Sequence, residues 1–550
     1  MCCITRWSFR VLKVQGTCWC CHLELASLIK SMTMIKSYPP TCFQRRGSSA
    51  VEVIRIMAAE EEEDRQVLTK SDSSFFVEGI VRHLRRTVRS GKTKPEAWRR
   101  QQLQGLLRLL VEREEDISRA LAQDLRKSAY ETYIFEISLA VEECKLALKK
   151  LRSWMAPQKV VGTVATFPSS GAIVPEPLGV ALVISTWNFP FVLAVNPMIG
   201  AIAAGCAVVL KPSEIAPATS ALLAKLIPLY LDTSAIQVVE GGVPEITTLL
   251  QQNWDKIFYT GNSKVGRIIM AAASKHLTPV TLELGGKCPV YIDSTANLKV
   301  ALRRIAVGKW GNNNGQACIA PDYILAEDSI APRVVDVLKE TIVEFFGKDP
   351  KTSKDLSRIV NQFHFKRLMD LLNDSRTLGK IVHGGEQDAA NLYIAPTVLY
   401  DVPLNVPIMT EEIFGPLLPI IKVKGAAEAK AFITERSKPL AFYVFTTDKT
   451  IAQLMVSEVS AGGIVVNDTC LQFVVPGLPF GGVGESGTGA YHGKFSFNTF
   501  SNHKAVLYRQ EVGDVYARYP PHTKHKQKII KSLLTGDFLG AILLLLGWRQ

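Results

Sequence analysis

Cys318 lies within "GNNNGQACIAPDY", a polar, glycine-bearing stretch with few apolar anchors. This setting favours a reactive thiol, although a free cysteine in a globular protein is more often an inert, buried hydrophobe. A thiol nucleophile needs a base or a positive dipole beside it. The nine histidines provide no partner in a recognisable motif, which argues against a papain-like hydrolase. The chain offers instead a carboxylate, Glu283 in "TLELGGK", and a carboxamide, Asn188 in "STWNFP".

The segment from 179 to 284 must position these groups. It alternates short apolar runs with helical segments, and the runs are "GVALVIST", "CAVVLKPS", "IQVVEG", "KIFYTG" and "TPVTLEL". Near-continuous apolar strands separated by helices predict a parallel sheet that is covered on both faces. Ligands of such sheets bind at the carboxyl ends of the strands, so the residues after each run are the candidate site.

Polar residues occupy those positions. Trp187 and Asn188 follow the first run, and Lys211 and Glu214 follow the second, where a cation and a carboxylate can hold a nucleotide's phosphate or ribose hydroxyls. After the fourth run, "TGNSKVG" (260–266) leads into a helix, and its glycine turn and free helix N–H groups predict a phosphate cradle. Each pattern alone is weak, because such turns need glycine and polar caps anyway. The absence of GxGxxG after the first run argues against an ordinary dinucleotide-binding motif.

Helices and a hairpin precede this sheet. Apolar residues recur at three- and four-residue steps from about 75 to 155, which predicts helices, and Pro157 ends that region. The following "VVGTVATFPSSGAIVPEPLG" is rich in β-formers, with turn residues at Ser169 to Gly171. A hairpin is therefore expected, either as an arm to another subunit or as a cap.

The first 56 residues differ in composition from the rest, being basic and holding six of the eleven cysteines. A transit peptide fits the scarcity of acidic residues, but not the cysteines. A metal site is conceivable, because Cys18 and Cys21 have CxxC spacing beside His22, yet no second ligand pair follows at a suitable distance. We favour a third interpretation, in which Met57 is the functional start and the extension is disordered or non-native.

The other five cysteines are scattered singly, which predicts a reducing compartment rather than disulfides. They are Cys144, Cys206, Cys288, Cys318 and Cys470. The net charge of +13 comes mostly from the two ends of the chain, and both signs alternate in between. A nucleic-acid partner is therefore not predicted.

Seven segments occur in the order and approximate spacing of a known family. They are "STWNFP", "LKPSE", "FYTGNSKVG", "TLELGGK", "GQACIAPDY", "EEIFGPLLPI" and "LPFGGVGESGTGAYHGKFSFNTFS". Over about residues 70 to 520 the chain resembles the NAD(P)-dependent aldehyde dehydrogenase superfamily, in particular plant members of its class 3 branch. "WGNNNG" is one residue longer than in the animal members, and Asn312 to Asn314 have no assigned role.

The resemblance implies an α/β fold with a Rossmann-type parallel-sheet cofactor domain, an α/β catalytic domain and a small β element for bridging and oligomerisation. The expected divisions are 1–56 as the extension, 57–283 as the N-terminal helices and NAD(P)-binding domain with a bridging hairpin at about 159–175, 284–485 as the catalytic domain, 486–510 as the bridging strand, and 511–550 as a tail. The resemblance implies a homodimer, and it implies no bound metal.

A mechanism is implied as well. Cys318 attacks the aldehyde carbonyl as a thiolate, and the Asn188 amide and the Cys318 backbone N–H hold the oxyanion. Collapse of that intermediate delivers hydride to nicotinamide and leaves a thioester. Glu283 then acts as the general base for the water that hydrolyses the thioester. The expected substrates are apolar aldehydes, either medium- or long-chain aliphatic or aromatic.

The cofactor contacts also come from the resemblance. Lys211 and Glu214 meet the adenosine ribose, and Glu214 favours NAD because a 2′-phosphate meets a like charge, although NADP is possible. Glu412 meets the nicotinamide ribose and Phe414 lines the ring's pocket. The remaining expected contacts are Trp187, Gly261, Asn262, Ser263, Lys264, Val265 and Gly266.

Two other functions are weighed against this one. An acyl transferase that releases the thioester to coenzyme A is disfavoured because Glu283 provides a hydrolytic base. A non-catalytic binding or structural role is disfavoured because Cys318, Glu283 and Asn188 occur together.

The tail is basic and then apolar, and its uncharged stretch from Phe538 to Trp548 is too short to cross a membrane. It binds an anionic membrane surface, or else packs over the substrate tunnel or a partner subunit. A cytoplasmic protein is expected, with endoplasmic reticulum association through the tail. The alternative is organelle import through residues 1–56.

Overall fold

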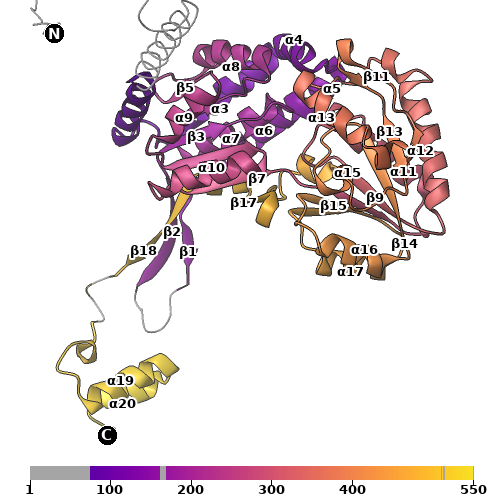
Figure 1. Ribbon diagram of the computed structural model, residues 1–550. Helices are drawn as coiled ribbons and strands as arrows, with labels where there is room; N and C mark the ends of the chain where they lie inside the picture. The colour runs from indigo at the N-terminus through magenta and orange to yellow at the C-terminus, as the bar shows by residue number, and fades with distance from the viewer. Residues whose placement is uncertain (1–74, 162–168, 510, 512–513, 549–550) are drawn as a thin grey trace, which may run out of the picture. The chain divides into compact units, whose positions relative to one another are not determined.

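The computed structural model describes residues 75–161, 169–509, 511 and 514–548, shown in Figure 1. The interpretations of residues 1–56 lie outside this part of the chain. Helical residues 75–89 come first, and four further helical elements and a π-helical turn follow. These are α3 (Glu96–Glu112), α4 (Glu114–Leu125), α5 (Ala129–Thr132), the π-helical turn η3 (Tyr133–Ile137) and α6 (Ser138–Met155).

A six-stranded sheet contains the five predicted parallel strands, in the order β5, β4, β3, β6, β7, with β17 paired antiparallel at the edge. The strands are β3 (Val180–Ile184), β4 (Ala207–Lys211), β5 (Ile236–Val238), β6 (Lys256–Gly261), β7 (Val280–Leu284) and β17 (Gly487–Thr488). The apolar runs form strands because a sheet covered on both faces buries every side chain, as in β3 and β4. This confirms the predicted fold class.

Helices cover both faces of this sheet (Figure 1). They are α7 (Val192–Ala204), α8 (Pro217–Tyr230), α9 (Val243–Leu250) and α10 (Ser263–Ser274). All thirteen residues of α7 are buried, and Gly205 ends it with a φ of 90°, a conformation that glycine adopts without strain. From β3 the chain moves first toward β5 and later to β6 on the other side. The resulting switch point between β3 and β6 is where such sheets bind ligands.

A second sheet has seven strands in the order β10, β13, β14, β9, β8, β15, β16, all parallel except β10. They are β8 (Pro289–Ile292), β9 (Tyr323–Glu327), β10 (Ile381–His383), β13 (Thr397–Tyr400), β14 (Leu417–Val423), β15 (Ala441–Phe445) and β16 (Gly463–Val466). The longer helices of this region are α11 (Leu298–Lys309), α12 (Ala331–Phe346), α13 (Gln362–Leu372), α16 (Ala426–Thr434) and α17 (Lys449–Glu458).

Short elements account for the remaining structure between residues 313 and 499. They are η5 (Asn313–Gly315), η6 (Pro350–Thr352), α14 (Ser375–Leu378), the paired strands β11 (Gln387–Asp388) and β12 (Tyr393–Ile394), η7 (Ala389–Asn391), α15 (Pro407–Thr410), η8 (Leu471–Val474), η9 (Gly484–Ser486) and α18 (Lys494–Thr499). Of these, η5 lies three residues before Cys318.

A third, antiparallel sheet joins distant parts of the chain. It contains β1 (Gln158–Val160), β2 (Ser170–Pro177) and β18 (Ser501–Tyr508), with β2 in the middle. Ser501 pairs with Pro177 and Tyr508 with Ser170, so β18 runs along the whole of β2. The predicted hairpin is present, but its turn position was wrong, because Ser170 and Gly171 begin β2 and Gly171 pairs with Val160. Residues 162–168, between the two strands, lie outside the described residues.

The tail follows as a 3-10 turn and two helices, η10 (Tyr516–Arg518), α19 (Lys524–Thr535) and α20 (Phe538–Leu545). Ala517, Ile529 and Leu544 form a small apolar cluster there. Among the described residues, none of the helices combines the length and the apolar character that crossing a bilayer requires.

Candidate active site

Cys318 lies at the junction of two cavities, in the loop between η5 and β9. One cavity, of about 620 Å³, runs along the carboxyl ends of the strands of the six-stranded sheet, and we call it the sheet-edge groove. The other, of about 560 Å³, has mostly apolar walls, and we call it the apolar channel. Cys318 lines both. A ligand in the groove and a ligand in the channel can therefore meet at its sulfur.

The sheet-edge groove brings together most of the residues predicted for a nucleotide site. They are Trp187, Lys211, Glu214, Gly261, Asn262, Val265, Glu412 and Phe414. The predicted catalytic residues Asn188 and Glu283 line the groove as well. Three predicted residues lie elsewhere, because Ser263 lines a different cavity, Lys264 is exposed to solvent, and Gly266 is buried against Leu284. The other predicted residues come together in the groove because the carboxyl ends of β3, β4, β6 and β7 meet at one edge of the sheet.

The loop around Cys318 is held by hydrogen bonds at its backbone. The Cys288 thiol donates to the Cys318 carbonyl oxygen at 3.3 Å, and the Asn188 side-chain amide donates to the Gln316 carbonyl oxygen at 3.0 Å. A carboxamide nitrogen carries two N–H donors, so Asn188 has a second one for a ligand. Burial raises the pKa of the Cys318 thiol well above its usual value, and the nearby Glu283 charge raises it further. The resting group is therefore a protonated thiol.

Glu283 lies inside β7, as its fourth residue, whereas the candidate site was expected among the residues that follow each strand. It pairs in register with Thr260 of β6, so both side chains project from the same face of the sheet. Neither carboxylate oxygen has a hydrogen-bond partner, and burial raises the pKa of Glu283 to about 7. The nearby Cys318 thiol and Thr260 hydroxyl moderate that rise. A carboxyl group with this pKa can act as a base near neutral pH.

The polar end of the groove is formed by Lys211 and Glu214. The Lys211 ammonium donates to the Glu214 carboxylate at 2.8 Å and to the Pro212 carbonyl oxygen at 2.7 Å. Lys211 is buried, whereas 48% of the Glu214 side chain is exposed. The ion pair adds little stability at such exposure, but it fixes a carboxylate that can accept hydrogen bonds from hydroxyl groups.

Asn262 caps α10, because its side-chain oxygen accepts the Val265 N–H at 2.9 Å. The cap uses one of the first-turn N–H groups that were predicted to cradle phosphate. Helix geometry leaves the other first-turn N–H groups without intrahelical partners, and anions are stabilised at that position.

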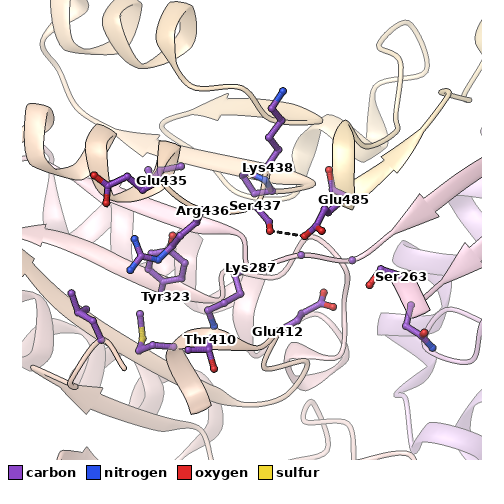
Figure 2. A pocket seen from close by; sticks show the side chains of 18 residues that line it. Ser263, Lys287, Tyr323, Thr410, Glu412, Glu435, Arg436, Ser437, Lys438 and Glu485 are labelled. Atoms are coloured by element: carbon purple, nitrogen blue, oxygen red, sulfur yellow. Dashed lines mark hydrogen bonds between the residues drawn. The ribbon is translucent and has the colours of Figure 1, made fainter. Parts of the chain in front are cut away.

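Glu412 lies between the groove and a third cavity of about 560 Å³ (Figure 2). Its carboxylate rests against Gly285, where an added Cβ would approach one of the carboxylate oxygens at 2.2 Å. Burial, followed by the Asp322 charge, raises the pKa of Glu412 to about 8. In the third cavity Ser437 donates to Glu485 at 2.6 Å, and Arg436 and Tyr323 lie side by side.

Aromatic rings form one wall of the groove. Phe414 has a φ of 50°, and its ring meets the Trp187 ring edge-on with 5.3 Å between centroids. His364 lies 4.7 Å from Trp187, and burial, followed by the Arg367 charge, lowers the pKa of His364 to about 4. Neither His364 nor Arg367 was predicted, because nothing in "NQFHFKRL" distinguishes them from residues of an ordinary amphipathic helix.

Two of the three asparagines without an assigned role, Asn313 and Asn314, shape the Cys318 loop. Asn313 and Asn314 have φ angles of 51° and 49°, which asparagine tolerates better than most residues. The Asn313 amide donates to the Asn188 carbonyl oxygen at 2.7 Å and to that of Gln316 at 3.2 Å, and so it links the two loops. The run of asparagines was the available signal for this turn.

The groove fits a nucleotide cofactor. Its inner end has buried polar atoms that lack partners, namely both Glu283 oxygens, the Thr260 hydroxyl and one Glu412 oxygen. Buried polar atoms without a hydrogen-bond partner are rare unless a ligand or a water molecule bonds to them. Within the described ranges, no group of three or more metal-ligating side chains is found, and the five cysteines there are free.

The sequence pattern of the "Aldehyde dehydrogenase family" matches residues 66–506. The chain is 55% identical to "Aldehyde dehydrogenase family 3 member I1, chloroplastic" of Arabidopsis thaliana, over 86% of this chain and 86% of that protein. It is 48% identical to "Aldehyde dehydrogenase, dimeric NADP-preferring" of Canis lupus familiaris, over 80% of this chain and 97% of that one.

A structure of Staphylococcus aureus AldH in a substrate-bound state superposes with a TM-score of 0.81 and 41% identity, over 83% of this chain and 99% of that one. Sequence and structure thus agree over most of the chain. The protein belongs to the NAD(P)-dependent aldehyde dehydrogenase family, in its family 3 branch.

Proposed function

We propose that this aldehyde dehydrogenase oxidises apolar aldehydes to carboxylic acids through a thiohemiacetal and a thioester on Cys318. The observation that carries the proposal is the position of Cys318, which lines both the polar groove and the apolar channel. The groove takes NAD(P) and the channel takes the aldehyde. The six-stranded sheet then serves as the cofactor-binding part and the seven-stranded sheet as the part that carries the nucleophile.

The channel walls support a medium- or long-chain aliphatic or an aromatic aldehyde. Phe135, Leu139, Phe189, Leu193 and Phe473 are among the lining residues. Burying one methylene group contributes about 0.8 kcal/mol, so a chain of several carbons gains substantial affinity there. The charged lining residues are Arg303, Arg304 and Asp468, and Arg304 pairs with Asp468 at 3.4 Å.

The first step needs a proton acceptor, because burial keeps the Cys318 thiol protonated. Glu283 is the carboxylate beside it and can receive that proton as the sulfur attacks the carbonyl carbon. The oxyanion that forms is held by the second N–H of Asn188 and by the Cys318 backbone N–H. Each such donor lowers a barrier of this kind by about 3 kcal/mol.

Bound NAD(P)+ supplies the hydride acceptor. Lys211 and Glu214 hold the adenosine ribose, Gly261, Asn262 and Val265 the adenine and pyrophosphate, and Glu412 the nicotinamide ribose, with Trp187 and Phe414 lining the groove. Ser263, Lys264 and Gly266 are not included, because they do not line it. Glu283 releases the thiol proton to solvent and, ionised again, removes a proton from the water that hydrolyses the thioester. A coenzyme A-dependent release is disfavoured by this base.

We also propose a homodimer, built through the sheet of β1, β2 and β18. Residues 502–505 of β18 are exposed along an edge strand, and such an edge can pair with another chain. The name of the dog relative, which includes "dimeric", supports a dimer. We propose a cytoplasmic protein, with import into an organelle as the alternative that the name of the chloroplastic relative supports.

The tail is proposed to bind an anionic membrane surface, such as that of the endoplasmic reticulum. It exposes large apolar side chains, with Leu539 on α20 70% exposed and Trp548, just after that helix, 78% exposed. Lys524, Lys526, Lys528 and Lys531 lie on α19 beside them. Basic residues next to an exposed apolar face give a short helix pair affinity for anionic lipid headgroups.

Replacing Glu283 by Gln should block hydrolysis of the thioester. Because the pKa of Glu283 is about 7, the hydrolytic rate in the wild type should fall about tenfold per pH unit below that pH and level off above it. Glu283→Gln should slow the NADH burst, because the Cys318 proton loses its acceptor, and it should remove this pH dependence and leave the acyl enzyme that does form unhydrolysed. Stopped-flow NADH formation and mass spectrometry of the quenched protein measure both effects. A steady turnover of Glu283→Gln with an unchanged pH profile would exclude Glu283 as the base.

Replacing Glu214 by Gln tests the cofactor assignment. The charge of the carboxylate disfavours a 2′-phosphate, so Glu214→Gln should raise kcat/KM with NADP relative to NAD. Lys211 is left unchanged in this variant. Glu485→Gln, which alters a carboxylate in the third cavity, is the matched control. An unchanged ratio of the two kcat/KM values in Glu214→Gln would contradict the assigned role.

Ending the chain at Pro521 removes both tail helices. The shortened protein should lose sedimentation with vesicles that contain phosphatidylserine, whereas its kcat with a short, soluble aldehyde should stay unchanged. Neutral phosphatidylcholine vesicles are the control for lipid charge. If the full-length protein and the shortened one behave identically with anionic vesicles, the tail is not a membrane anchor.

A further inference from the structure

We propose that three buried charged residues, Lys127, Glu131 and Glu136, position the two loops that form the oxyanion site. We call these three residues the clamp. None of them was predicted to be functional, and none lines the groove or the channel. The inference rests on the proposed function, because it concerns how Asn188 and the Cys318 loop are held in place.

Lys127 and Glu136 hold the Asn188 loop. The Lys127 ammonium donates to the Glu136 carboxylate at 2.5 Å and to the Asn188 carbonyl oxygen at 2.9 Å. The other Glu136 oxygen accepts the backbone N–H groups of Phe191 and Val192, at 3.1 and 3.0 Å. The clamp thus fixes the backbone at Asn188 and again at the start of α7.

Glu131 holds the Cys318 loop. One of its oxygens accepts the Asn313 backbone N–H at 2.7 Å, and the other accepts the Ser357 hydroxyl at 2.6 Å. Asn313 in turn donates to the carbonyl oxygens of Asn188 and Gln316. Gln316 accepts the Asn188 amide, so the direction of that amide depends on a chain of contacts that begins at Glu131.

A π-helical turn lets one segment reach both loops. Residues five apart in an α-helix point about 140° away from each other, whereas a π-helical turn returns residue i+5 close to the direction of residue i. Glu131 and Glu136 are five apart, and η3 covers Tyr133–Ile137. Both carboxylates can therefore face the active-site loops from one short segment.

Fold stability does not require an ion pair at this place. Both side chains of the Lys127–Glu136 pair are completely buried, and the Lys127 ammonium also lies 3.9 Å from the centre of the Phe189 ring. Removing two charges from water is costly, and replacing such a pair with apolar side chains is often neutral or stabilising. What this pair adds is three directed contacts to the loop that carries Asn188.

The clamp residues line neither the apolar channel nor the sheet-edge groove, so they are positioning residues. Their loss should displace the Asn188 amide and slow the steps in which an oxyanion forms. Displacement of a catalytic group by about 1 Å can slow a reaction about a hundredfold. Alkylation of Cys318 by iodoacetamide involves no carbonyl oxyanion, because sulfur displaces iodide from a saturated carbon. It should therefore not depend on the clamp.

The test uses Lys127→Met in the full-length protein, with Lys256→Met as the matched control. Lys256 is a buried lysine at the opposite end of β6 from the site. We expect Lys127→Met to slow the NADH burst with nonanal between tenfold and about a hundredfold, with little change in KM and an unchanged iodoacetamide alkylation rate. Lys256→Met should leave both rates near those of the wild type.

A double-mutant cycle shows whether the effect passes through Asn188. In an Asn188→Ala background, Lys127→Met should cause little further loss, because the group that it positions is already absent. Equal losses in both backgrounds, or a parallel loss of burst and alkylation rates, would overturn the clamp. Asn313→Gly is a second variant that buries no unpaired charge and tolerates the positive φ, and it should show the same signature.

The two proposals fail in different ways. If the wild type does not oxidise nonanal, or if Asn188→Ala keeps the full rate, the proposed function itself is wrong. If Asn188→Ala slows the burst while Lys127→Met and Asn313→Gly do not, the function stands and the clamp is wrong.

Discussion

The burial of Glu283 beside the Cys318 thiol is the constraint on which the rest of the site depends. Burial raises the pKa of both groups, so at rest the thiol is protonated and the carboxyl group is poised near neutrality. A charge that develops beside buried groups is stabilised most by donors that are already in place, because they need no reorganisation during the reaction. The surrounding loops therefore have to hold donors in place before the reaction starts.

Two sheets share this task. The six-stranded sheet contributes Asn188 and Glu283 from the carboxyl ends of its strands, and the seven-stranded sheet carries the loop with Cys318 just before β9. Neither sheet alone contains a complete site. The hydrogen bond from Asn188 to Gln316 joins the two halves at the reacting centre, and the buried Lys127–Glu136 pair supports it from behind. The groove and the channel meet at the same place.

Much of this arrangement could be predicted from the sequence. The rest could not be predicted, and the reasons are physical. Five apolar runs predicted the parallel sheet, because full burial leaves a local pattern in each strand. The clamp left no such pattern. Lys127 and Asn188 are 61 residues apart, and Glu131 and Asn313 are 182 apart, so their pairing depends on tertiary packing alone. Ser263 and Lys264 belong to the expected motif, yet helix geometry directs them away from the groove.

The central claim is that Cys318 oxidises an apolar aldehyde and releases the acid by hydrolysis. The most direct measurement is NADH formation from NAD+ with nonanal, without coenzyme A, in the wild type and in Cys318→Ser, together with detection of nonanoic acid. The account predicts steady turnover in the wild type, with one acid formed per NADH, and loss of turnover in Cys318→Ser. Full activity of Cys318→Ser, or turnover that requires coenzyme A, would contradict it.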